Sequence, residues 1–185
     1  MKALFIKYKG VLTFLLLFSG SYLMLSICYS VYLSLTDGSA YPPDFITNLV
    51  AKQSTTLLES LGYKAYVLPH PSQPSMELFV NDMFLARIVE GCNAISVLIL
   101  FVSFVVAFAQ RFKKTLLFIV AGTALIYAVN IIRIAVLAIA LYEYPQHGHL
   151  LHGVVFPSII YGIVVLLWLV WVRNLAPTTK KVPAV

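Results

Sequence analysis

Cys92 is the residue of this sequence best placed to do chemistry, because it stands where a polar region meets an apolar one. The stretch from Arg87 to Ala94 ends the long polar region, and the run from Ala94 to Ala109 is apolar except for two serines. A thiolate is a strong nucleophile. At a water–membrane boundary it can meet a membrane-bound substrate, provided that other reactive side chains reach the same level.

Two other polar side chains are expected at that level. Arg133 lies nine residues before Tyr142, so it falls about 14 Å below the outer end of a helix that ends there, and its side chain can snorkel outward. His152 begins the last apolar segment. Cys92 and His152 are both expected at helix N-termini, which favour a thiolate and a neutral imidazole. Asn130, three residues before Arg133, would hold the guanidinium.

These residue types together suit acyl transfer. Cys92 would attack a carbonyl, His152 would move the proton, and Arg133 would stabilise the thiolate or the developing oxyanion. Arg133 also has a structural interpretation, in which it snorkels and pairs with Glu90 or Glu143. Considered alone, Cys92 would be an inert packing residue, so the hypothesis depends on the three residues lying together.

The remaining histidines and the second cysteine carry weaker signals. His147 and His149 could form a metal site with His152, but no acidic or cysteine ligand shares a regular spacing with them. No metal and no other cofactor is therefore expected. Cys28 lies inside the first apolar segment, where a packing role is expected. With no C-x-x-C pair, the cysteines predict neither a disulfide framework nor a zinc cluster.

The composition is that of an integral membrane protein. The chain of 185 residues is 61% hydrophobic and only 11% charged, against a usual charged share of about 25%. The net charge of +6 does not indicate nucleic-acid binding, because nine of the 13 Lys and Arg residues stand in three short clusters beside apolar segments. These clusters are Lys2/Lys7/Lys9, Arg111/Lys113/Lys114 and Arg173/Lys180/Lys181.

The apolar segments predict one membrane domain, 1–185, with four transmembrane helices at about 11–35, 93–110, 115–142 and 153–172. The first is expected to be an uncleaved signal anchor, since a signal-peptide core is only about 7–15 residues long. A cytoplasmic N-terminus places all three basic clusters inside and all seven Asp and Glu residues outside. The predicted topology is therefore N-in/C-in.

The segment 36–92 is the one substantial polar region, and it is predicted to be a small extracytoplasmic α+β segment. Pro42-Pro43-Asp44 precedes apolar residues at helical spacing, which predicts an amphipathic helix ending near Gly62. The stretch 63–68 alternates like a strand. The stretches 76–80 and 83–89 flank Asn81-Asp82, which predicts a β-hairpin that leads into Cys92. The fold class is thus all-α polytopic with this small segment.

At these residues the sequence resembles the exosortase/archaeosortase family of membrane cysteine transpeptidases, most closely its short XrtF type. The matching motifs are Glu90-Gly91-Cys92-Asn93, Asn130-Ile131-Ile132-Arg133 and His152-Gly153-Val154-Val155-Phe156. The resemblance covers about 12–172. Many members have a small residue and then glycine after the cysteine, where this chain has Asn93-Ala94. The chain also lacks the extra N-terminal spans of longer exosortases, which a partner protein or a homo-oligomer would supply.

The resemblance implies a thiol protease of protein sorting. Its substrates would be membrane-anchored exported proteins that end in a short motif, a transmembrane helix and a basic tail. Cys92 would be the nucleophile, His152 the general base and acid, and Arg133 the electrostatic stabiliser. Asn130, Glu90 and Asn93 would support them.

Two other functions stay open at the level of sequence. A non-catalytic envelope assembly or scaffold protein would use the region from Thr36 to Val89 to bind partners and would not need Cys92. A thiol–disulfide carrier would need a second cysteine near Cys92. Cys28, the only candidate, is predicted about 10 Å below the outer end of its own span.

Overall fold

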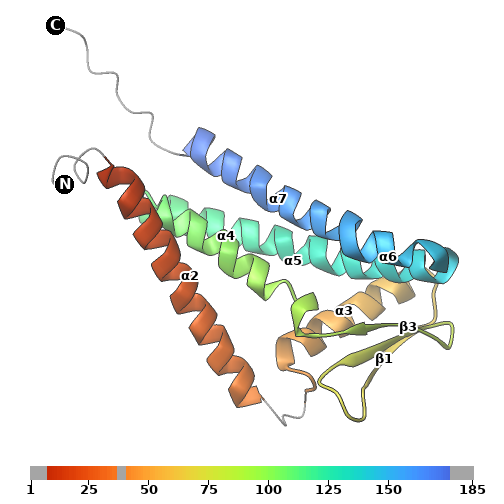
Figure 1. Cartoon of the computed structure of the whole chain (residues 1–185). Helices are drawn as coiled ribbons and strands as arrows, with labels where there is room; N and C mark the ends of the chain where they lie inside the picture. Colours follow the sequence, from red (N-terminus) through yellow and green to blue (C-terminus); the bar gives the residue numbers. More distant parts are fainter. Residues whose placement is uncertain (1–7, 37–40, 176–185) are drawn as a thin grey trace, which may run out of the picture.

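The computed structural model describes residues 8–36 and 41–175, without the side chains of His147, His149, His152, Asn174 and Leu175. Long helices lie side by side, and a short helix and a small sheet are gathered at one end of them (Figure 1). The described chain begins and ends at the other end of the bundle (Figure 1). Lys9, Arg111 and Arg173 stand at the helix ends found there. All six acidic residues of the described chain lie toward the short helix and the sheet, together with Lys52, Lys64 and Arg87.

Three helices of the described chain are long and apolar enough to cross a membrane, and the protein is a multi-pass membrane protein. The first is α2 (Lys9–Thr36), the second is α5 (Phe112–Glu143), and the third covers Gly153–Arg173. The third is built from a π-helical turn (Leu151–Val155), α7 (Phe156–Val170) and a second π-helical turn (Trp171–Leu175). A 3₁₀ turn (Pro145–His147) and the single turn α6 (Gly148–Leu150) precede it. These helices coincide with three of the four expected spans.

The segment expected to form the second span is shorter than predicted. Its helix, α4 (Ile95–Ala107), has 13 residues. A helix of that length is about 20 Å long, against about 30 Å for the hydrocarbon core. It starts late because Ala94 has a φ of 64°, a left-handed conformation that no helix continues through. A fourth membrane crossing therefore stays a prediction.

The bundle core lies between α4, α5 and α7. Phe101, Ile126, Val164 and Trp171 are almost completely buried there. Gly122 of α5 allows the close approach of α4, because a Cβ at this position would lie 2.3 Å from the ring of Phe101. In contrast, α2 buries no residue. It contacts α4 along one side, so most of its surface is left to face lipid.

The polar region folds as the sequence predicts. Helix α3 (Phe45–Ser60) begins after Asp44, whose carboxylate accepts hydrogen bonds from the backbone N–H groups of Ile46 and Thr47. This is an N-cap, which satisfies helix donors that have no partner within the helix. Strands β1 (Ala65–Pro69), β2 (Met76–Val80) and β3 (Met83–Ile88) form an antiparallel sheet in that order.

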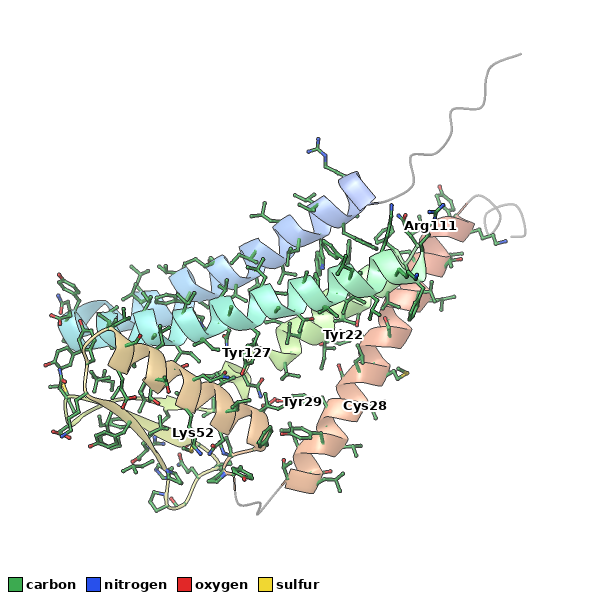
Figure 2. The ribbon with its side chains drawn as sticks, turned by 180° about the vertical axis from the view of Figure 1, so that it is seen from behind. Tyr22, Cys28, Tyr29, Lys52, Arg111 and Tyr127 are labelled. Carbon is green, nitrogen blue, oxygen red and sulfur yellow. The ribbon has the colours of Figure 1, made fainter. Side chains whose placement is uncertain are left out.

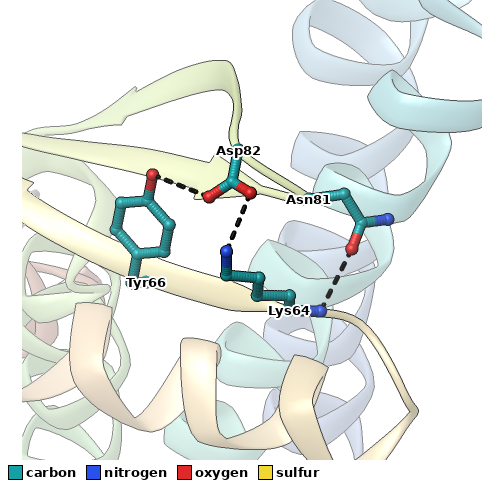
Figure 3. A network of polar contacts seen from close by, with 4 residues as sticks. All are labelled: Lys64, Tyr66, Asn81 and Asp82. Atoms are coloured by element: carbon teal, nitrogen blue, oxygen red, sulfur yellow. Dashed lines mark hydrogen bonds and ion pairs between the residues drawn. The ribbon is translucent and has the colours of Figure 1, made fainter.

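The hairpin between β2 and β3 has the predicted two-residue turn. Asn81 and Asp82 both have positive φ, 50° and 63°, as a two-residue turn of the right twist requires. Asn81 also contacts the start of β1, because its side-chain oxygen accepts a hydrogen bond from the backbone N–H of Lys64 (Figure 3). The hairpin and the helix of the polar region are thus confirmed.

A second apolar core fixes this polar region to the membrane helices. It joins α3, the sheet and the last turns of α5 through Val50, Leu58, Leu78, Val80 and Ala135, all of them at most 1% exposed. The sheet is therefore packed directly against α5, and β3 delivers the chain to Cys92 at that junction.

Candidate functional site

Cys92 lies in a turn of its own between the sheet and the bundle. Residues Glu90–Cys92 form a 3₁₀ turn, in which the backbone N–H of Cys92 donates to the carbonyl of Val89 (2.8 Å). Helix α4 begins three residues further on, at Ile95. The expectation that Cys92 stands directly at a helix N-terminus is therefore corrected. The Asn93 side chain, one residue before the N-cap Ala94, accepts a hydrogen bond from the N–H of Ile95 (2.9 Å) at the start of this helix.

Asn130 connects the Cys92 turn to Arg133. Its side-chain amide, fully buried, donates to the backbone carbonyl of Cys92 at 2.8 Å. Its side-chain oxygen accepts a hydrogen bond from Nη1 of Arg133 at 3.2 Å. The contact between Asn130 and Arg133 confirms the prediction made from their spacing. Two residues of α5 and the cysteine turn, 38 residues away in sequence, thus form one hydrogen-bonded unit.

The guanidinium of Arg133 has a buried donor without a partner among the described residues. Its Nε is buried without a hydrogen-bond partner in the described chain. Neither Glu90 nor Glu143 pairs with it, since the ion pairs among described residues are Lys64–Asp82 and His70–Glu77. The alternative in which Arg133 pairs with Glu90 or Glu143 is therefore not what the described residues show. A buried unpaired N–H costs about 1–3 kcal/mol, and an incoming acceptor would relieve that cost.

Cys92 and Arg133 border the same pocket. Its volume is about 280 Å³. One wall is formed by β2 and β3 and the other by the second half of α5, with Arg87 at the sheet side. The rest of the lining is aliphatic: Leu78, Ala86, Ile88, Leu137, Ala138 and Leu141 among others. A substrate carbonyl that reaches the thiol would therefore enter mostly apolar surroundings that also hold two arginines, Arg133 on α5 and Arg87 on the sheet.

A second polar network supports the cysteine turn from the opposite side. The side-chain amide of Asn93 donates to the hydroxyls of Tyr29 (2.8 Å) and Thr47 (3.0 Å). The Thr47 hydroxyl in turn donates to Asp44, and the Tyr32 hydroxyl donates to the same carboxylate. Asn93, Thr47 and Asp44 are each at most 1% exposed. Buried networks with every member satisfied make a structure rigid.

The first membrane helix thus joins this network through two tyrosines, Tyr29 and Tyr32. Tyr29 projects from α2 toward α3, whereas Cys28 lies on the outer side of the same helix (Figure 2). Both cysteines are free thiols, and Cys28 is exposed.

Sequence reasoning found Asp44 as a helix start but missed the contribution of Thr47 and Tyr29. Thr47 occupies the third position of the capped helix, where a hydroxyl faces back to the cap. Tyr29 and Tyr32 are polar-tipped residues three apart in an apolar span. Both signals are visible in the sequence, but nothing local connects them to Asn93.

His152 stands in the π-helical turn Leu151–Val155. Its side chain, like those of His147 and His149, is outside the described part of the structure, so its distance from Cys92 stays a prediction. The same applies to the metal site considered for these histidines. Among the described residues, no group of three or more histidine, cysteine or acidic side chains could hold a metal ion.

These features define a multi-pass membrane protein with a cysteine–arginine site where its membrane helices meet a small polar α+β unit. The sequence profile of the transmembrane exosortases (Exosortase_EpsH) matches residues 8–175. The chain therefore belongs to the transmembrane exosortase family. No curated protein and no solved structure gives a significant match.

Ala94 is one of the two residues after Cys92 at which this chain departs from the pattern expected for its family. The resemblance stated in the sequence analysis leads us to expect a glycine at this position, and the structure gives Ala94 a φ of 64°. Glycine adopts that conformation without steric cost, whereas an L-residue pays about 1–2 kcal/mol. The observed backbone is thus the one that a glycine would favour, so the alanine does not indicate a different turn.

Proposed function

We propose that this protein is a cysteine peptidase/transpeptidase that cleaves C-terminal sorting signals of exported proteins. One observation carries the proposal. Cys92 and Arg133 line one pocket, and the buried Nε of Arg133 has no hydrogen-bond partner in the described chain. Membership of the exosortase family supports the same class of reaction. The assignment to the short XrtF type is also a proposal, based on the motifs around Cys92, Arg133 and His152.

The first half-reaction forms an acyl-enzyme. The thiol proton of Cys92 passes to His152, and Sγ attacks the substrate carbonyl carbon to form a C–S bond. The negative charge that develops on the carbonyl oxygen is stabilised by the guanidinium of Arg133. The C–N bond then breaks, and the leaving amine takes the proton from His152.

The second half-reaction releases the product. An acceptor amine or water attacks the thioester carbonyl and gives a proton to His152, and the C–S bond breaks. The proton returns to Cys92, so the enzyme is regenerated. Asn130 and Asn93 have a positioning role in both steps, because they hold the backbone on either side of the sulfur.

The proposed substrates are membrane-anchored proteins with a C-terminal motif, a transmembrane helix and a basic tail. The proposed location is the bacterial cytoplasmic membrane, with both termini inside and the site outside. The separation of Lys9, Arg111 and Arg173 from the acidic residues supports this orientation, since basic residues favour the cytoplasmic side. For a bundle of this size, a partner protein or a second copy would complete the walls of the site.

Orientation can be tested with a membrane-impermeant maleimide on intact spheroplasts. We expect it to label Cys92 at the outer face and to leave Cys28, which faces lipid, unlabelled. Labelling of Cys92 only after permeabilisation would reverse the orientation and contradict the proposed mechanism.

The nucleophile can be tested in cells that co-express an exported protein with such a C-terminal signal, encoded near the enzyme. We expect Cys92→Ala to abolish processing while the variant still accumulates in the membrane. Cys28→Ala is the matched control and should process normally. Processing by Cys92→Ala would instead favour the scaffold function.

A further inference from the structure

The shape and chemistry of the Cys92 pocket bear on which substrate residue is recognised, a question that the proposed function leaves open. The pocket continues from Cys92 and Arg133 past Leu137 to Leu141. Residues 133, 137 and 141 are four apart, so they lie on one face of α5 and follow one another along it. That direction leads along α5 toward the sheet and away from the chain ends (Figure 1).

The direction of the pocket decides which side of the scissile bond it serves. A substrate with a C-terminal membrane helix has its leaving segment in the bilayer and its exported segment beyond it. When the thiol contacts the substrate carbonyl carbon and the carbonyl oxygen lies at Arg133, the C-terminal leaving segment of the substrate points toward the membrane helices. The pocket lies in the other direction, next to the sheet. It is therefore on the acyl side.

The lining decides the chemistry of the occupant. Ala86 and Leu78 face each other across β2 and β3 and form the sheet wall, opposite Ala138 and Leu141 on α5. Leu78 and Ala138 are each 1% exposed. Burial of an aliphatic side chain in such surroundings is favourable by about 1.5–3 kcal/mol. A polar side chain of the same size that lies against this aliphatic part, away from Arg87 and Arg133, would lose its hydrogen bonds to water.

We infer that this pocket is a specificity site for an aliphatic side chain on the substrate residue whose carbonyl Cys92 attacks. The inference rests on the proposed function for the identity of the reacting carbonyl. It adds a substrate class, namely signals whose acyl-side residue is leucine-like rather than glycine or a polar residue.

The test uses N-acetyl amino-acid chloromethyl ketones on purified protein in phospholipid nanodiscs, where both faces are accessible. The Cys92 thiolate displaces chloride, so a C–S bond forms, a C–Cl bond breaks and the thiol proton goes to the buffer. The side chain of the probe then occupies the acyl-side position. Glycine, leucine and asparagine derivatives are compared by mass spectrometry of the Cys92 peptide.

We expect the leucine derivative to alkylate Cys92 about tenfold faster or more than the glycine and asparagine derivatives. Rates are divided by those with glutathione, which corrects for intrinsic reactivity. Alkylation of Cys28 measures enrichment of each probe in lipid. Equal corrected rates for the three probes at Cys92 would overturn the inference.

Pocket variants show whether the preference comes from this site. Ala86→Leu fills the pocket from a partly exposed strand position and should remove most of the preference. Ala124→Leu adds the same atoms on the exposed face of α5 and should retain it. A preference unchanged by Ala86→Leu would contradict the assignment. Leu141→Ala gives an independent result, because it should shift preference toward a bulkier cyclohexylalanine derivative.

The proposed function and the pocket assignment can fail separately. Without a leucine preference, loss of processing in Cys92→Ala would leave the proposed function standing and overturn only the pocket assignment. Processing by Cys92→Ala would overturn the function itself, on which the assignment depends.

Discussion

The turn that carries Cys92 and the turn that joins β2 to β3 are each held by hydrogen bonds, but the side chains that hold the first are buried and those that hold the second are exposed. At the hairpin, Lys64 pairs with Asp82 at 2.8 Å, and the side chains are 67% and 62% exposed (Figure 3). At the cysteine, Asn93 and Asn130 are at most 1% exposed.

This difference in burial indicates that the network around Cys92, and not the one at the hairpin turn, is the one on which function depends. Water can replace each contact at the hairpin turn, so the loss of one contact changes the free energy of unfolding little. No water compensates a lost contact around Asn93 or Asn130, because a buried polar group without a partner bears the full desolvation cost. The geometry of Cys92 should therefore be sensitive to single atoms far from it in sequence, while the hairpin turn should tolerate them.

The largest effect is expected at Arg133. Arg133→Lys retains the charge and the reach but lacks the planar fork of donors. Loss of one well-placed oxyanion donor costs about 10²–10³ in rate. The variant should therefore accumulate normally and cleave at least about a hundredfold more slowly in single-turnover assays of membranes. Near-normal cleavage would mean that Arg133 only anchors its helix in the bilayer.

A smaller effect on stability is expected at Thr47, the link between Asn93 and Asp44. Thr47→Val keeps the shape but removes the hydroxyl, which leaves an oxygen of the buried Asp44 carboxylate without its donor. We expect a loss of about 1–3 kcal/mol in the free energy of unfolding, measured in detergent.

The matched control for this change is Thr47→Ser, which keeps the hydroxyl. Thr47→Ser should restore most of the stability that Thr47→Val loses. It should also restore the wild-type rate at which a maleimide alkylates Cys92, a rate that Thr47→Val is expected to change. If both variants behaved alike in alkylation, the network would be structural only and would not position the thiol.

The smallest effect is expected at the hairpin turn. The hydrogen bond from Lys64 lowers the pKa of Asp82, and the same bond raises the pKa of Lys64. A lowered carboxyl pKa stabilises the fold above the unfolded pKa, and this contribution is lost as the pH falls through the folded value. Asp82→Asn should therefore reduce the melting temperature slightly near neutral pH and have no effect in acid.

High salt should remove the same small difference, because the pair is exposed to solvent. An Asp82→Asn effect as large as that of Thr47→Val would break the comparison between the two networks.

Much of this protein is determined by local sequence. Long apolar runs dictate α2, α5 and the last helix, since only a helix satisfies its own backbone in lipid. The N-cap at Asp44 and the turn at Asn81-Asp82 follow from the side chains of those very residues. The contact between Asn130 and Arg133 follows from helical spacing.

Only the tertiary structure decided how these elements meet. The hydrogen bonds from Asn130 to Cys92 and from Asn93 to Tyr29 and Thr47 join segments 38, 64 and 46 residues apart. Hydropathy likewise did not predict that the second apolar run forms a helix of only 13 residues. Its start at Ile95 depends on the backbone at Ala94 and on the hydrogen bond from Ile95 to the Asn93 side chain. Hydropathy records how each segment interacts with solvent, whereas the site depends on packing between segments, which a local pattern does not encode.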